Sequence, residues 1–211
     1  MVKELNIFGD IVSDAWIDED VTPTKVKTEI SNLTQDDEIN ININCFGGEV
    51  FAAVAIANII KSSPAKKTFN VIGICASAAT MLFQHDDIVN ISKGAMMMYH
   101  KPIVGMFGNA NDFRKQIEIL DKIEGENIIR NLAIRTKKPT DELSKLISDE
   151  WWLTSDEAIS NLGFIASGAV AIENKTKTKQ ENIYKNYLEK KKALNVDVFK
   201  QFTNFKKQLQ R

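Results

Sequence analysis

Apolar and polar residues follow two different patterns along this chain, one typical of β-strands and the other of buried α-helices. Residues 38–44 read EINININ, so every second residue is isoleucine and one face of a strand would be buried. Residues 50–60 are instead densely apolar and rich in alanine, which predicts a buried helix that ends before Pro64. The same patterns predict further strands over residues 5–8, 69–74, 88–91 and 95–98, and further helices over residues 24–33, 76–83 and 109–135.

Strands that alternate with helices in this order are typical of a layered α/β domain with crossover helices. The predicted helix over residues 109–135 is the longest, and its apolar positions cover more than one face. We therefore expect this helix to pack against another subunit. Its apolar positions are Phe113, Ile117, Ile119, Leu120, Ile123, Ile128, Ile129 and Leu132.

Length and charge divide the chain into two parts. Its 211 residues suffice for one domain with an appendage, and 44% of them are hydrophobic, which allows a sizeable core. Residues 173–211 carry 11 Lys and Arg against 4 Asp and Glu, whereas residues 1–172 carry 16 against 24. We therefore expect a domain over 1–172 and a basic tail over 173–211. Apolar residues recur in the tail at helical spacing, which favours a linker and an amphipathic partner-binding helix over a nucleic-acid arm.

The cysteines and the N-terminus indicate the compartment. Cys45 and Cys75 each lie in an apolar stretch without a second cysteine nearby, so we expect neither a disulfide framework nor a zinc or other metal site. The first residues lack the apolar core of a signal peptide, and no apolar run is long enough to span a bilayer. These features predict a soluble protein of a reducing cytoplasm.

Ser77 lies among small residues, in the segment GICASAA over residues 73–79, between a predicted strand and a predicted helix. This order can lift a serine hydroxyl clear of a sheet. Such a serine needs a base, and the chain has only two histidines. His100 follows a predicted strand at the start of a loop, where site residues tend to lie. His85 lies in the polar turn QHDD and is expected to be an exposed surface residue.

A third group must orient the histidine and stabilise its charged form. Glu150 and Asp149 are the candidates, because both precede a pair of tryptophans in an apolar neighbourhood. Gly47 and Gly48 follow a predicted strand, and glycine lets backbone N–H groups approach a developing oxyanion. Paired glycines also bind phosphates, but here no Lys-Ser or Lys-Thr follows them. The pattern as a whole indicates a serine hydrolase, and among these a peptidase.

Several segments resemble the Clp-type serine peptidases, in the same order and at similar spacing. Residues 44–50 (NCFGGEV) resemble the family's Asn-Ser-Pro-Gly-Gly turn, with Cys45 and Phe46 in place of serine and proline. Residues 73–79 resemble its nucleophile segment, and residues 99–102 (YHKP) its His-Gln-Pro. The resemblance extends over residues 4 to about 172. It implies an α/β fold, a Clp protease/crotonase-like spiral of β-β-α units with a long protruding handle helix, to which the C-terminal helical tail would be added.

The resemblance also implies roles for residues of this chain. Ser77 would be the nucleophile, His100 the general base and then acid, and Glu150, in preference to Asp149, the orienting carboxylate where degradative relatives have aspartate. The N–H groups of Gly48 and Ala78 would form the oxyanion hole. No metal or organic cofactor is implied. The main chain of two segments would clamp the substrate as an added strand, namely Gly47, Gly48, Glu49 and Val50, and Ile103 and Val104.

Within the superfamily, the likeness is closer to the head maturation (prohead) proteases of phages and prophages. The segments FGDI over 8–11, DVTP over 20–23 and EWWLT over 150–154 carry it, and the first predicted strand starts too soon after Met1 for an N-terminal axial loop. The implied substrate is scaffold or capsid protein, the implied assembly is a homo-oligomeric ring that stacks through residues 108–135, and the tail is a possible tether. The alternatives are an ATPase-coupled degradative Clp subunit, a crotonase-like acyl-CoA enzyme and an inactive shell protein.

Overall fold

The structure is a computed structural model that describes residues 1–167, so the predicted tail over 173–211 lies outside the described residues. The described residues fall into two units. The first unit contains Met1–Pro102 and the described residues from Ile119 onward, and the second contains Ile103–Glu118. The fold and the candidate site described below belong to the first unit, except where the second is named.

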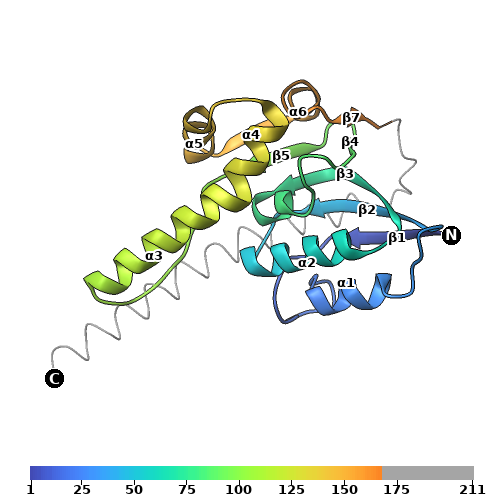
Figure 1. Ribbon diagram of the computed structural model, residues 1–211, viewed down its shortest axis with the longest axis horizontal. Coiled ribbons are helices and arrows are strands. Elements are labelled where there is room, and N and C mark those ends of the chain that lie inside the picture. The colour runs from blue at the N-terminus through green and yellow to red at the C-terminus, as the bar shows by residue number, and fades with distance from the viewer. Residues whose placement is uncertain (168–211) are drawn as a thin grey trace. The chain divides into compact units, whose positions relative to one another are not determined.

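The elements alternate largely as the sequence predicts (Figure 1). Residues 76–83 differ, because only Ser77–Met81 is helical and this short piece is a 3₁₀ helix. The bounds are β1 Val2–Ile7, α1 Pro23–Ile30, β2 Glu38–Cys45, α2 Val50–Ser62, β3 Lys66–Ala76, η1 Ser77–Met81, β4 Val89–Ile91, β5 Met96–Tyr99, α3 Ala110–Ile123, the π-helical η2 Glu124–Ile129, α4 Arg130–Thr136, α5 Thr140–Ser148, β6 Trp151–Thr154, α6 Ser155–Leu162 and β7 Ile165–Ala166.

Five of the strands form a parallel sheet in the order β1-β2-β3-β4-β7. The crossover helices α1 and α2 pack against each other and lie on the same side of this sheet (Figure 1). Neighbouring strands in sequence order, with crossovers on one side, make the chain advance as a spiral. β3 is long enough to pair with β4 through its first half and with β5 through its second half, and β6 pairs antiparallel with β5.

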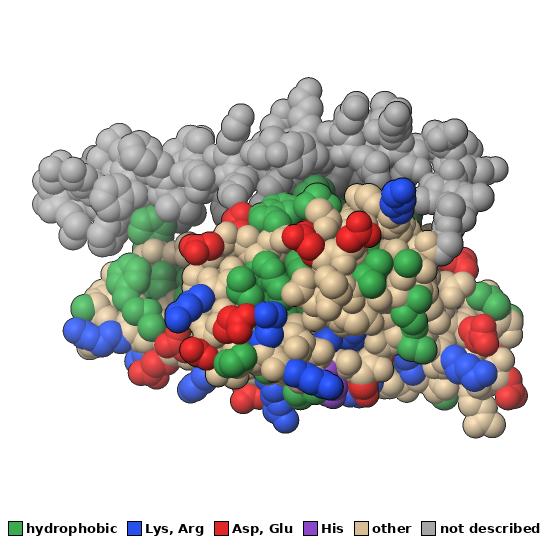
Figure 2. Space-filling model, turned by 90° about the horizontal axis from the view of Figure 1, so that it is seen from above, with side chains coloured by type: hydrophobic (Ala, Val, Ile, Leu, Met, Phe, Trp, Pro, Cys, Tyr) green, Lys and Arg blue, Asp and Glu red, His purple; other side chains and the backbone are tan. Residues whose placement is uncertain are grey.

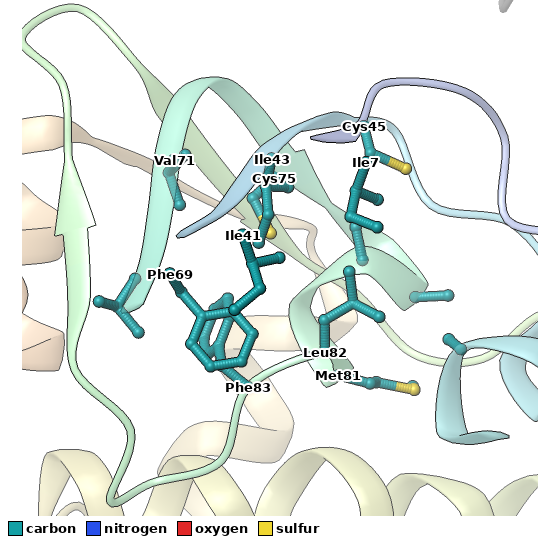
Figure 3. Close-up of a cluster of buried hydrophobic side chains, with 14 of the residues drawn as sticks. Ile7, Ile41, Ile43, Cys45, Phe69, Val71, Cys75, Met81, Leu82 and Phe83 are labelled. Atoms are coloured by element: carbon teal, nitrogen blue, oxygen red, sulfur yellow. The ribbon is translucent and has the colours of Figure 1, made fainter. Parts of the chain in front are cut away.

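The two faces of β2 confirm the strand predicted from its alternating sequence. Ile39, Ile41 and Ile43 are fully buried on the face that α1 and α2 cover. Figure 3 shows Ile41 and Ile43 among the other side chains of this core, with Phe69 and Phe83 beside them. The opposite face carries polar side chains instead. Asn amides on four neighbouring strands bond in a row there, from Asn6 through Asn42 and Asn70 to Asn90.

Two helices begin where the sequence places capping residues. The Thr22 side chain accepts a hydrogen bond from the N–H of Lys25, and Pro23 occupies the first turn of α1. At α6 the Thr154 hydroxyl accepts from the N–H of Glu157, whose carboxylate accepts in turn from the N–H of Thr154. This reciprocal pair is a capping box.

The segment predicted as one long helix is continuous from α3 through η2 to α4, and η2 adds a π-helical segment that the sequence pattern did not indicate. Within the second unit, Phe113 and Ile117 of this helix are 45% and 56% exposed. This exposure leaves apolar surface that a partner could cover, and the expected packing against another subunit stays a prediction.

The described surface mixes charge with isolated apolar groups. On the face shown in Figure 2, acidic and basic side chains are interspersed with hydrophobic ones. Trp16 and Phe51 are the most exposed aromatic side chains of the described residues, at 88% and 69%. Among those residues no helix combines the length and the apolar character that crossing a bilayer requires.

Candidate active site

Four strand ends meet at one edge of the sheet. β2, β3 and β5 are parallel neighbours, so their carboxyl ends lie together, with Cys45 opposite Cys75 and Cys75 opposite Met97. β6 is antiparallel to β5, which brings its amino end to the same edge. The carboxyl edge of a parallel sheet is where α/β proteins place their ligands. Here these ends lead directly into Gly47, Ser77, His100 and Glu150.

Ser77 and His100 are in hydrogen-bond contact. The Ser77 hydroxyl oxygen lies 2.6 Å from Nε2 of His100, and both residues are partly buried. Ser77 has a φ of 56°, a left-handed conformation that is uncommon outside glycine. A serine in this strained turn, between a strand and a helix, is the arrangement of a nucleophile elbow. The structure therefore pairs a serine with a base, as acyl transfer requires.

Local contacts hold the elbow. The Thr80 hydroxyl donates to the carbonyl oxygen of Ser77 across 2.7 Å, and Ala78, Ala79 and Thr80 are buried in η1. Because small side chains fill this turn, the helix can lie close to the sheet while the Ser77 hydroxyl faces His100. The other histidine, His85, is exposed in the turn between η1 and β4, as predicted.

The Gly47–Gly48 turn lies directly against the serine. A Cβ built on Gly47 would be 2.8 Å from the Cβ of Ser77 and 2.9 Å from the amide nitrogen of Ala78. Gly47 has a φ of 106° and Gly48 a φ of 146°. A side chain at position 47 would therefore collide with the nucleophile segment, and the turn requires glycine for space as well as for conformation.

Backbone hydrogen bonds fix the direction of this turn. The Gly47 carbonyl accepts from the N–H of Ile11 (2.9 Å), and the N–H of Glu49 donates to the Ile11 carbonyl (2.8 Å). The C=O and N–H of one trans peptide point in opposite directions. Since the Gly47 carbonyl points toward Ile11, the N–H of Gly48 points away from it. This is the orientation that an oxyanion-hole donor needs if the oxyanion lies on the Ser77 side.

Glu150 occupies an unusual position just before β6. Tyr99 lies opposite Trp151 in the last pair of the antiparallel ladder, and His100 and Glu150 are the residues next to that pair in the chain. The ladder ends there, because the N–H of Lys101 donates to the carbonyl of Ile147. Glu150 is exposed, has a φ of 58°, and accepts a 3.3 Å hydrogen bond from Nε1 of Trp152.

Asp149, the other candidate carboxylate, is the C-cap of α5 and is also exposed. Asp149 is one residue further from the ladder than Glu150. Register therefore favours Glu150, and its role stays a prediction.

The predicted substrate-binding segments lie in different units. Gly47, Gly48, Glu49 and Val50 belong to the first unit and surround the turn beside Ser77. Ile103 and Val104 belong to the second unit, where they are 78% and 51% exposed. The proposed clamp between the two segments stays a prediction.

Two supporting groups had no sequence signal that we recognised. Ser13 binds the Glu49 carboxylate through its N–H and its hydroxyl. Lys101, which follows His100, forms an ion pair with Glu124 of the π-helical segment across 3.2 Å, and Glu124 also accepts from the Ser144 hydroxyl. Both sets of partners lie far apart in the sequence, so only the fold identifies them.

A serine on a left-handed turn, bonded to a histidine and packed against a glycine turn at the edge of a parallel sheet, defines a serine hydrolase. The sequence model of the Clp protease family matches residues 10–168. The chain belongs to this family, whose members are serine peptidases and therefore hydrolases.

Curated relatives agree with this assignment, and a solved structure has a similar fold. The chain is 30% identical over 124 residues to the ATP-dependent Clp protease proteolytic subunit 3 of Rhodococcus jostii. The aligned region covers 57% of this chain and 60% of the relative. The chain is 23% identical over 173 residues to the ATP-dependent Clp protease proteolytic subunit of Porphyromonas gingivalis, covering 75% of each chain. The fold is similar to that of a ClpP1 mutant from Listeria monocytogenes, with a TM-score of 0.63, 20% identity, and coverage of 79% of this chain and 92% of that one.

Proposed function

We propose that this protein is a serine endopeptidase that cleaves peptide bonds through an acyl-enzyme. The single observation that carries the proposal is the 2.6 Å contact between the Ser77 hydroxyl and Nε2 of His100. In this reaction His100 takes the hydroxyl proton at Nε2 while the serine oxygen attacks the peptide carbonyl. His100 then gives this proton to the leaving amine. A water activated by the same nitrogen releases the acyl group and restores the serine.

The remaining groups have supporting roles in the proposal. The N–H groups of Gly48 and Ala78 stabilise the oxyanion, where one donor typically contributes about 3–4 kcal/mol to catalysis. The close approach of Gly47 to the amide nitrogen of Ala78 supports a shared site for these donors. Glu150 orients His100, and the backbones of residues 48–50 and 103–104 hold an extended substrate.

A fluorophosphonate probe tests the proposal, because it reacts only with an activated serine. We expect the wild-type chain to be labelled, and Ser77→Ala and His100→Ala to lose labelling while keeping the wild-type circular dichroism spectrum. Ser92→Ala and His85→Ala are matched controls that should label normally, since neither residue lies at the strand ends that form the site. Equal labelling of Ser77→Ala would contradict the proposal.

For the biological substrate we propose scaffold or capsid protein of an assembling phage head, in the host cytoplasm or in the head itself. The segments over 8–11, 20–23 and 150–154, which resemble head maturation proteases, support this assignment. Co-expression with the major capsid and scaffold proteins of a tailed phage should yield shortened products that Ser77→Ala does not produce. Deletion of residues 173–211 should reduce incorporation of the protease into heads if the tail is the tether.

The second candidate is a proteolytic subunit that works with an ATPase. The curated relatives support it, since those described above are proteolytic subunits of ATP-dependent proteases. Casein degradation that depends on ATP and an added unfoldase would favour this function over head maturation.

For either function we propose a homo-oligomeric ring, stacked through residues 108–135, and the exposed Phe113 and Ile117 support such contacts. Native mass spectrometry would give the number of subunits.

A further inference from the structure

Cys45 lies where strand β2 ends, just before the Gly47–Gly48 turn. It is the last residue of β2, and the pairing of β2 with β3 shifts register between Ile43 and Cys45. Its side chain is 1% exposed, and Figure 3 shows it at the end of β2 with Ile7 and the other buried side chains of the core. A buried thiol is a weak hydrogen-bond donor and acceptor, so hydrogen bonds at this sulfur depend on how the surrounding backbone is placed.

The Cys45 sulfur has hydrogen-bond partners in two glycines. The N–H of Gly47 donates to Sγ across 3.3 Å, and Sγ lies 3.1 Å from the carbonyl oxygen of Gly9, to which the thiol donates. The carbonyl of Gly47 is also within reach, at 3.7 Å. One side chain therefore links the loop after β1, the end of β2 and the first residue of the turn.

Gly47 is consequently held at both of its polar groups. Its N–H is bound by Cys45 and its carbonyl by the N–H of Ile11. The peptide that joins Gly47 to Gly48 carries the N–H proposed to face the oxyanion, and glycine alone would let this peptide rotate freely. Fixing Gly47 at two points removes that freedom before the substrate arrives, which is how an oxyanion hole becomes preorganised.

We propose that the Cys45 thiol is a positioning residue for catalysis, which acts through Gly47 by keeping the Gly48 N–H aimed at the oxyanion. The inference rests on the proposed function, because it assigns Cys45 a part in the same reaction. Cys45 does not touch the substrate. The Clp-type peptidases that the chain resembles have a serine in this place, and a hydroxyl can accept and donate the same bonds.

The ionisation of Cys45 agrees with this role. Burial raises the pKa of the Cys45 thiol to about 12, so the sulfur keeps its proton across the neutral range. A neutral thiol donates to Gly9 and accepts from Gly47 at once. A thiolate would lose the donated bond and would place a negative charge beside the site where the oxyanion forms.

Cys75 provides a matched control within the same protein. It lies directly opposite Cys45 on β3 and is fully buried, so its replacement by alanine removes the same sulfur atom from the same layer of the core. No hydrogen bond between the Cys75 thiol and the turn is found in the described residues. Replacing either cysteine with alanine therefore removes similar packing contacts, whereas only the replacement of Cys45 also removes the hydrogen bond to Gly47.

The experiment compares Cys45→Ala, Cys45→Val, Cys45→Ser and Cys75→Ala in the full-length protein. Steady-state kinetics on a fluorogenic peptide and inhibition by a peptide boronate, which imitates the tetrahedral intermediate, are measured for each. We expect Cys45→Ala and Cys45→Val to lower kcat by about 10- to 100-fold, as misplaced catalytic groups do. Their KM should change little, and their affinity for the boronate should fall in parallel with kcat. Cys45→Ser should restore most of the activity, and Cys75→Ala should lower kcat clearly less than Cys45→Ala does.

The outcomes separate this inference from the function on which it rests. If the wild-type protein shows no Ser77-dependent labelling or cleavage, the proposed function itself fails. If the wild type is active and either folded Cys45 variant, Ala or Val, keeps its kcat, the inference about Cys45 is overturned. Equal losses in Cys45→Ala and Cys75→Ala would also overturn it, because packing alone would then explain them.

Discussion

Gly47 lies so close to Ser77 that a Cβ placed on the glycine would be 2.8 Å from the Cβ of the serine. We therefore predict that Gly47→Ala lowers kcat by at least about 100-fold, because either the turn or the nucleophile must move. Peptide hydrolysis and probe labelling measure the loss. Gly94→Ala is the control: its φ is 83°, but an added Cβ meets nothing within 4 Å. This variant should lose some stability and retain its activity, and a similar loss of activity would contradict the steric argument.

Glu150 combines the proposed catalytic carboxylate with a strained backbone. Its φ of 58° is costly for a residue with a long side chain, by roughly 1 kcal/mol, and such strain is often kept at functional sites. We predict that Glu150→Asn raises the melting temperature, since asparagine tolerates this conformation, yet lowers kcat. Glu150→Gln should lower kcat by up to about 10⁴-fold, as loss of an orienting carboxylate can.

Two controls accompany the Glu150 variants. Lys137, with a φ of 59° at the end of α4, has the same backbone conformation away from the site, so Lys137→Asn should stabilise the fold without changing kcat. Asp149→Asn should be active. The reverse result, an inactive Asp149→Asn with an active Glu150→Gln, would assign the orienting role to Asp149.

Arg135 joins three segments of the first unit. Its guanidinium donates to the carbonyls of Gln84, Asp87 and Leu162 and lies over the rings of Phe83 and Phe164. Lysine has neither the planar shape nor enough donors to replace these contacts. We predict that Arg135→Lys lowers the free energy of unfolding by about 2–3 kcal/mol in urea titrations.

Arg130→Lys is the control for this substitution. Arg130 is exposed and pairs with Glu126 one turn away, and such pairs contribute about 0.5 kcal/mol or less. If the two variants were equally stable, the contacts of Arg135 would not contribute to folding as proposed.

Asp37 makes the stability of the folded protein depend on pH. The N-terminal ammonium of Met1, together with the N–H and hydroxyl of Thr34, lowers the pKa of Asp37 from 3.8 to about 2. Because the folded pKa is below the unfolded one, the stabilising contribution is complete above pH 4 and is lost as the pH falls toward 2. Asp37→Asn should therefore melt at a lower temperature than the wild type at pH 7. The difference should shrink between pH 4 and pH 2, and a difference that stays constant over this range would contradict the assignment.

Much of the fold was predictable because the residues that form it are neighbours in sequence. The alternation in β2 and the dense apolar run in α2 predicted both elements within two residues of their ends. α5, β6 and β7 were not predicted. β6 is a four-residue strand that includes two tryptophans and is defined by its pairing with β5, a partner more than 50 residues away. The 3₁₀ form of η1 depends likewise on the packing of its small residues against the sheet.

The sequence by itself determined which chemical groups are present: a serine among small residues, a histidine after a strand, two carboxylates before a tryptophan pair, and a glycine turn. These follow from residue type and local periodicity, which fix the propensity of each segment. Only the tertiary structure decided their arrangement. Strand pairing brings Ser77 to His100, sets Gly47 against both Ser77 and the Cys45 thiol, and places Glu150 at the end of the β5–β6 ladder. Distances between segments so far apart in the chain depend on the register of the sheet, and no local pattern in the sequence specifies that register.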